Sequence, residues 1–244
     1  MIRACVAVIS GGLGFMRGVC VQKMFLQKLM PSYRHILLVE HLSYTTAQLD
    51  YLRRIGWEVR LVEPLRTQKT NFAAARWPRT FTKLQLWSQT DLDYIVYLDA
   101  DACPFKSYPE LFGLEFDTVA ATRVRPEDPK RFNSGVMSLK PSEETFLNIL
   151  EWIKKKPEDN GAKLADQGLL NLMYAGKFHD LPDKYNQRKW NKKSADTVIA
   201  HIRPVPWKRS RHPVALRPYV KEWRQQEDAC VREHGAFIHS SSAD

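Results

Sequence analysis

Two aspartates, Asp99 and Asp101, follow directly after a short apolar segment of the chain. The uninterrupted apolar character of residues 94–98 predicts a buried strand. Side chains two residues apart at a strand end can direct both carboxylates to one point outside the sheet, where they repel each other unless a cation lies between them. Oxygen ligands of this kind suit Mg²⁺ or Mn²⁺, which keep coordination positions open for substrate phosphates. Because an Asp-x-Asp pair is common in loops, this interpretation depends on which other residues converge on it.

The strands and helices expected around Asp99 and Asp101 predict where these two residues lie in the fold. Strands are expected at residues 6–9, 35–39, 57–62 and 94–98, alternating with helices at 17–29, 45–55 and 82–89. This order predicts a parallel sheet covered by helices, in which ligands bind beyond the carboxyl ends of the strands. The glycine-rich turn at 10–14 and Asp99 both lie at such ends. The second half is less regular, with short strands expected at 119–122, 136–139 and 198–202 and helices at 142–154 and 166–174.

Size and composition describe an ordinary globular protein with an excess of positive charge. The chain has 244 residues, 44% hydrophobic and 26% charged, and no apolar run of membrane-spanning length. Its first residues are interpreted as a strand rather than a signal peptide, and its four scattered cysteines favour a reducing compartment, so we expect a cytoplasmic protein. The net charge of +10 indicates an anionic partner such as a nucleotide, nucleic acid, acidic glycan or lipid headgroup. Residues 203–224 are rich in Lys, Arg and Pro, which argues against one long helix there.

Other polar residues could serve the same site, although each also has a structural interpretation. Lys83 and Arg76 precede the 94–98 strand and could neutralise phosphate, or lie on the surface. Phe15 could stack on a base or pack in the core. His201 ends the last expected strand, where it is either a third ligand for Mn²⁺ or a structural histidine. Asn133 and Ser134 could orient sugar hydroxyls, and Asp166 with Gln167 could cap a helix or face a sugar.

The order of these motifs resembles the glycogenin-like retaining glycosyltransferases, known as family 8. The matching pieces are TKLQLW (82–87), YLDAD (97–101), FNSGV (132–136), ADQGLLN (165–171), and His201 followed by Pro206-Trp207. The resemblance covers roughly residues 2–208. It implies an α/β, Rossmann-like nucleotide-diphospho-sugar transferase fold of the GT-A type, with a mostly parallel central sheet flanked by helices. We therefore expect a catalytic domain at 1–208 and a basic extension at 209–244, read as a loosely packed tail or as packed on the same domain.

The resemblance also implies an activity and a set of site residues. The expected activity is retaining transfer of a hexose from a UDP-sugar to a separate hydroxyl acceptor, assisted by Mn²⁺ or alternatively Mg²⁺. UDP-glucose is the first expected donor, with UDP-N-acetylglucosamine and UDP-galactose as alternatives. The implied metal ligands are Asp99, Asp101 and His201. The implied donor-binding residues are Ile9, Ser10, Gly11, Gly12, Phe15, Arg76, Lys83, Ala100, Asn133, Ser134 and Lys208, and the implied catalytic residues are Lys83, Asp166 and Gln167.

The sequence departs from the family at its end segment, HIRPVPWKR, which lacks the expected Gly and has a shorter spacing. Either Lys208 or Arg203 could replace the phosphate-binding Lys of the family. Lys163 stands where glycogenin has an acid, and no tyrosine-bearing insert is evident at 185–201, so we expect no self-glucosylation. The alternatives are a nucleotidyltransferase and a basic nucleic-acid-binding module, while the 203–224 stretch could contact an anionic membrane or an acidic acceptor.

Overall fold

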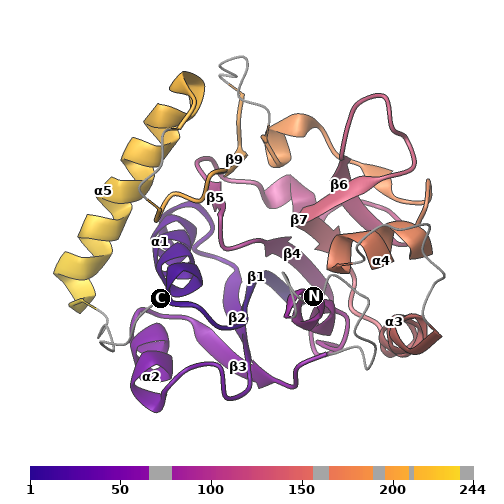
Figure 1. Ribbon diagram of the computed structural model, residues 1–244, viewed down its shortest axis with the longest axis horizontal. Coiled ribbons are helices and arrows are strands. Elements are labelled where there is room, and N and C mark those ends of the chain that lie inside the picture. Colours follow the sequence, from indigo (N-terminus) through magenta and orange to yellow (C-terminus); the bar gives the residue numbers. More distant parts are fainter. Residues whose placement is uncertain (66–78, 156–164, 189–195, 209–211, 237–244) are drawn as a thin grey trace.

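A computed structural model describes residues 1–65, 79–155, 165–188, 196–208 and 212–236, and its centre is a sheet in the order β3-β2-β1-β4-β7-β6-β8 (Figure 1). The first four of these strands in the sheet order are parallel, and β7 runs antiparallel to β4 and to β6. The expected fold, a mostly parallel sheet flanked by helices, is confirmed. The strands are β1 Arg3–Ile9, β2 Arg34–Glu40, β3 Glu58–Val62, β4 Tyr94–Leu98, β6 Val119–Arg123, β7 Phe132–Leu139 and β8 His179–Asp180.

Helices cover both faces of this sheet, since the side chains of a strand point alternately to its two sides. On one face, Cys5, Ala7 and Ile9 of β1 pack in a cluster with side chains of α1 and α2. On the other face, Ala4 and Val6 of the same strand pack with side chains of η2, α3 and α4. The helices are α1 Leu13–Leu29, α2 Thr46–Arg54, α3 Glu143–Lys155 and α4 Asp166–Met173, with 3₁₀ turns η2 Thr80–Leu86, η3 Pro109–Phe112, η4 Asp183–Tyr185 and η5 Val214–Leu216.

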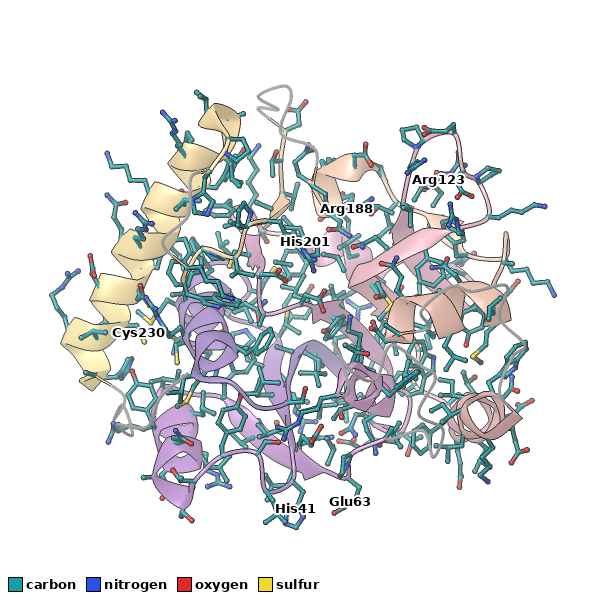
Figure 2. The ribbon with its side chains drawn as sticks, in the orientation of Figure 1. His41, Glu63, Arg123, Arg188, His201 and Cys230 are labelled. Carbon is teal, nitrogen blue, oxygen red and sulfur yellow. The ribbon has the colours of Figure 1, made fainter. Side chains whose placement is uncertain are left out.

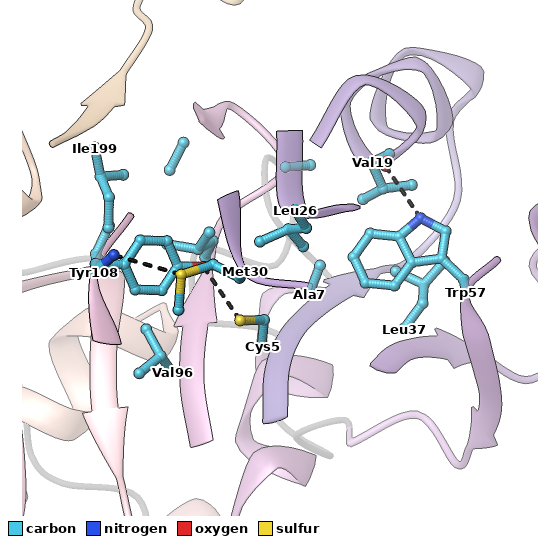
Figure 3. Close-up of a cluster of buried hydrophobic side chains, with 14 of the residues drawn as sticks. Cys5, Ala7, Val19, Leu26, Met30, Leu37, Trp57, Val96, Tyr108 and Ile199 are labelled. Carbon is cyan, nitrogen blue, oxygen red and sulfur yellow. Dashed lines mark hydrogen bonds between the residues drawn. The ribbon is translucent and has the colours of Figure 1, made fainter. Parts of the chain in front are cut away.

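Polar atoms inside the first cluster find partners there (Figure 3). The indole nitrogen of Trp57 donates to the carbonyl of Val19 at 3.1 Å, and the hydroxyl of Tyr108 donates to the Cys5 sulfur at 3.3 Å. These contacts connect strands to α1 and to the η3 segment, so the cluster fixes the helix against the sheet whose strand ends carry the site.

Two expected elements differ from the structure in form. The helix expected at 82–89 is the 3₁₀ turn η2, which begins two residues earlier and ends at Leu86. The late strand expected at 198–202 is β9, Ile199–His201, and it does not join the main sheet. It pairs antiparallel with β5, Ala102–Pro104, which places His201 opposite Ala102. This short pairing brings Ile199–His201 to the loop that follows β4.

The expectation of a loosely packed tail is wrong for residues 217–234, which form the long helix α5, Arg217–His234. Proline stands in its first turn, where the missing N–H costs nothing. Val220 and Trp223 are buried in a third cluster with side chains of α1, β5 and β9, and α5 runs beside α1 at the outer edge of the molecule (Figure 1). Arg17 of α1 also forms a bidentate ion pair with Glu227 of α5, at 2.6 and 3.0 Å. We propose that this helix belongs to the same domain as residues 1–208.

Among the described residues, no helix combines the length and the apolar character that crossing a membrane requires.

Candidate functional site

A cavity of about 440 Å³ opens at the carboxyl ends of β1 and β4, within the usual size range of small-molecule sites. Segments far apart in the sequence supply its walls: the end of β1, η2, the loop after β4, β7, the start of α4 and the segment after β9. Its lining residues are Val8, Ile9, Ser10, Phe15, Arg79, Thr80, Lys83, Tyr97, Asp99, Ala100, Asp101, Asn133, Ser134, Ala165, Asp166, Gln167, Arg203 and Val205.

The three predicted metal ligands converge beside this cavity. One ligand atom each from Asp99, Asp101 and His201 lies within 4.8 Å of the other two. The two aspartates follow β4, and His201 reaches them through the β5–β9 pairing. The buried amide of Gln22 donates to the carbonyls of Asp99 and Ala102, at 3.0 and 2.8 Å, and so fixes the loop that carries both carboxylates.

A chain of amides orients His201, which lies in the middle of the molecule beside the ends of β4 and β7 (Figure 2). Its Nδ1 lies 3.0 Å from the side-chain oxygen of Asn186, whose amide nitrogen donates to Asn133 at 2.8 Å. Because that Asn186 oxygen can only accept, this network assigns the ring proton to Nδ1. The lone pair of Nε2 then faces Asp101, 3.2 Å away, as a metal-binding imidazole requires.

The side chain that faces Asp101 and His201 is a cation, Arg203. Its contacts show whether the proposed ligand atoms attract a positive charge. Arg203 Nε lies 3.1 Å from Nε2 of His201 and 3.4 Å from a carboxylate oxygen of Asp101. Burial alone would raise the pKa of Asp101, but nearby positive charge, that of His201 when its ring is protonated and that of Arg203, outweighs burial and holds the pKa below its ordinary value. Two carboxylates and one imidazole nitrogen, already attracting a positive group, fit a divalent cation such as Mn²⁺.

Lys83 lies at the centre of the remaining polar groups. Its ammonium is 2.9 Å from Asp99 and 2.8 Å from Asp166, and it donates to the Ser134 hydroxyl at 3.3 Å. Burial would lower the pKa of Lys83, yet the two carboxylates raise it well above its ordinary value. Tyr97 donates its hydroxyl to the same Asp99 oxygen at 2.5 Å. Lys83 is therefore a permanent cation that can stabilise negative charge but cannot act as a general base.

The four predicted sugar-facing residues form one hydrogen-bonded group between β7 and α4. The side-chain oxygen of Gln167 accepts from the amide of Asn133 at 2.7 Å and from the backbone N–H of Ser134 at 3.3 Å. The hydroxyl of Ser134 donates to Asp166 at 2.8 Å. Asn171, one helical turn after Gln167, pairs with both backbone groups of Phe132 and so holds α4 against β7.

The turn after β1 reaches the cavity only in part. Ile9, Ser10 and Phe15 line it, and Phe15 packs edge-on against Trp207 at 5.8 Å. Gly11 and Gly12 have φ angles of +70° and +85°, which glycine adopts without strain, and they are not among the lining residues of the described chain.

Three further predicted positions are not seen at the cavity among the described residues. Arg76 and Lys163 fall outside the described residues. Lys208 is exposed and does not line the cavity in the described part of the chain, because the turn at 205–208 directs Trp207 inward toward Trp223 instead. Arg203, the alternative phosphate ligand, does line it.

Sequence reasoning missed several residues that build the site. Arg79 lies against Gly11 and approaches the buried Glu40, with its Nε 3.8 Å away. Tyr97 carried a usable signal, since it shares a strand face with Asp99. Asn186 and Gln22 carried none, because an isolated amide in a loop or a helix has no pattern that would single it out.

A mostly parallel α/β sheet with an Asp-x-Asp pair at a strand end defines a GT-A type nucleotide-sugar transferase fold. The family model for glycosyl transferase family 8 matches residues 25–204, and the chain belongs to that family. It is 37% identical over 149 residues to a glycogenin of Neurospora crassa, covering 59% of this chain and 20% of that protein. It is 32% identical over 136 residues to UDP-glucuronate:xylan alpha-glucuronosyltransferase 1 of Arabidopsis thaliana, covering 55% and 19%. The chain thus spans about a fifth of the length of these curated relatives.

Solved structures share the fold at low sequence identity. The galactosyltransferase LgtC, in complex with donor and acceptor sugar analogues, aligns with a TM-score of 0.71 at 16% identity, over 93% of this chain and 95% of that one. The apo glycosyltransferase GlyE of Streptococcus pneumoniae TIGR4 aligns with a TM-score of 0.68 at 18% identity, over 99% and 66%. The expected family and fold are confirmed.

Proposed function

We propose that this chain is a retaining glycosyltransferase that moves a hexose from a UDP-sugar to a separate hydroxyl acceptor with the help of Mn²⁺. The observation that carries the proposal is the convergence of Asp99, Asp101 and the buried His201 beside one cavity, next to the permanent cation Lys83. Membership in family 8 favours this function over a nucleotidyltransferase or a nucleic-acid-binding module.

The leaving group of such a transfer is UDP, and its departure concentrates negative charge on the diphosphate. Asp99, Asp101 and His201 would hold the divalent cation, which when bound supplies Lewis-acid stabilisation of the departing diphosphate. Lys83 adds a second positive charge from a side chain that is only 11% exposed, where charge stabilisation is stronger than in water. Asp166 positions that ammonium through their 2.8 Å contact.

The sugar of the donor would lie against the group formed by Asn133, Ser134, Asp166 and Gln167, which line the same cavity. The uracil would lie toward Ile9, Ser10 and Phe15 at the end of β1. Both assignments extend the family resemblance, and the side chains concerned line one cavity. UDP-glucose remains the first expected donor, and the acceptor is a separate molecule.

The test is UDP release from a panel of donors in the absence of acceptor, measured with and without Mn²⁺. The panel holds UDP-glucose, UDP-galactose, UDP-N-acetylglucosamine and, because a similar protein is a glucuronosyltransferase, UDP-glucuronate. We expect slow, Mn²⁺-dependent hydrolysis of one donor, lost in Asp101→Asn. Asp50→Asn, on the surface of α2, is the matched control and should behave as wild type. Full activity in Asp101→Asn would refute the ligand assignment.

A further inference from the structure

The side chain of Arg203 occupies the place of a cation between two of the three proposed metal ligands. Its Nε faces His201 at 3.1 Å and Asp101 at 3.4 Å, and the same side chain lines the cavity. A divalent cation that bound through Nε2 of His201 would need the lone pair that Arg203 Nε–H now faces. Arg203 and a bound metal therefore compete for the same ligand atoms.

The contact of Arg203 differs from that of Lys83, the other cation of the site. Lys83 is only 11% exposed and has two carboxylate partners at 2.9 Å or less. The side chain of Arg203 is 64% exposed, although its partner Asp101 is only 9% exposed. Water therefore reaches the guanidinium and can replace its contacts, which the buried ammonium of Lys83 does not allow.

We propose that Arg203 is a mobile cation that couples metal binding to donor binding. In the donor-free protein it balances the charge of Asp101, and a metal displaces it from Asp101 and His201. The released guanidinium remains at the cavity wall, where its planar fork suits the phosphate oxygens of a UDP-sugar. This inference rests on the proposed function, because it takes the donor to be a nucleoside diphosphate sugar.

The two binding events then favour each other beyond any direct contact between metal and diphosphate. A diphosphate that attracts the guanidinium of Arg203 frees Asp101 and His201 to bind the metal. Conversely, a metal that displaces this guanidinium makes it available to bind the diphosphate. By linkage, the factor by which UDP strengthens Mn²⁺ binding equals the factor by which Mn²⁺ strengthens UDP binding. Removing Arg203 should lower that factor.

The experiment compares wild type with Arg203→Gln in two titrations. The first measures Mn²⁺ affinity of the donor-free protein from the electron paramagnetic resonance signal of free Mn²⁺. The second measures UDP affinity at saturating Mn²⁺ by calorimetry. We expect Arg203→Gln to bind Mn²⁺ about twofold to fivefold more tightly, since the guanidinium that competes for Asp101 and His201 is gone. It should bind UDP about tenfold more weakly, since a charge-assisted phosphate contact is lost.

Arg53→Gln is the matched control, because it removes a partly exposed arginine (48%) that pairs with a carboxylate on α2, away from the cavity. It should leave both affinities unchanged. An Arg203→Gln protein that binds Mn²⁺ no more tightly than wild type, or that binds UDP equally well, would overturn the inference while leaving the proposed function standing. A wild-type protein that binds neither Mn²⁺ nor UDP would overturn the proposed function and this inference with it.

Discussion

Gly135 of β7 lies next to His201. Replacing Gly135 with alanine should disturb the proposed metal site without changing the identity of any proposed ligand. A Cβ added to Gly135 would lie 2.5 Å from Cε1 and 2.7 Å from Nδ1 of His201, and 2.9 Å from the side-chain oxygen of Asn133. Real Cβ atoms do not approach other atoms this closely, so the imidazole has to move. The φ angle of Gly135 lies outside the positive range, so the backbone itself accepts alanine.

The imidazole has little room to move, which gives the expected size of the effect. The His201 side chain is only 1% exposed, and Nδ1 is bonded to Asn186 at 3.0 Å, the contact that also fixes the ring proton. Crowding of this kind in a packed core costs about 1–3 kcal/mol of unfolding free energy. Changes in the groups that orient a metal ligand typically lower metal affinity about tenfold to hundredfold, or about 1.4–2.7 kcal/mol.

The assay is Mn²⁺ affinity of the donor-free protein, measured beside thermal unfolding. Gly113→Ala is the matched control, because the atom nearest to its added Cβ is 3.9 Å away. We expect Gly135→Ala to bind Mn²⁺ at least about tenfold more weakly than Gly113→Ala. A folded Gly135→Ala protein with wild-type Mn²⁺ affinity would show that His201 is not held as a ligand, and the reasoning would fail.

Two further predictions concern stability. Lys23 lies in the core with its ammonium 2.8 Å from Nδ1 of His35, and burial lowers the pKa of Lys23 to about 8. Since this pKa is lower in the folded than in the unfolded chain, folding should become more favourable as pH rises from about 8 toward the ordinary lysine pKa. Lys23→Met should raise the free energy of unfolding at pH 7 by about 1–2 kcal/mol in urea titrations, and a loss of stability would contradict this. Trp223→Ala should lower the free energy of unfolding by about 3–5 kcal/mol, because the indole is fully buried between α5 and the rest of the molecule. Val231→Ala on the exposed side of α5 is its control, and equal effects of the two would mean that α5 does not dock.

The sheet could be predicted because its central strands are buried on both faces. A strand of this kind, such as Tyr94–Leu98, is a continuous apolar run whose limits are visible in the sequence. Thr45 and Gln48 mark the start of α2 in the same local way, since they form a reciprocal capping box. Boundaries were missed where tertiary contacts decide them, as at η2, Thr80–Leu86, whose buried side chains pack against the sheet.

Helix α5 was not predicted because its many charged residues obscure the helical spacing of its few apolar residues. Prolines and basic residues before position 219 suggest an irregular tail, and its mean hydropathy is low. Val220, Trp223 and Cys230 nevertheless recur at helical spacing, and all three are buried. That stripe was readable in principle, but its partner surface on α1 and β9 exists only in the folded molecule.

The site was predictable in its parts but not in its connections. Asp99 and Asp101 could be placed together because only one residue, Ala100, separates them. His201 lies beside the two aspartates because two three-residue strands, β5 and β9, pair with each other. No local sequence pattern in β5 or β9 predicts this pairing. Asn186 fixes the imidazole from a loop position with no distinguishing neighbours. Only the family resemblance could supply these connections from the sequence.

The charges around the cavity explain why a cation and a nucleotide donor should bind together. Three carboxylates, Asp99, Asp101 and Asp166, and three positive side chains, Arg79, Lys83 and Arg203, line the cavity, so their charges balance near neutral pH. A diphosphate entering alone would leave the site with an excess of negative charge, whereas a divalent cation first gives it an excess of positive charge. The diphosphate of a UDP-sugar then returns the site to its original balance. Binding in either order costs less when the partner is present, because opposite charges close together in a partly buried site attract strongly.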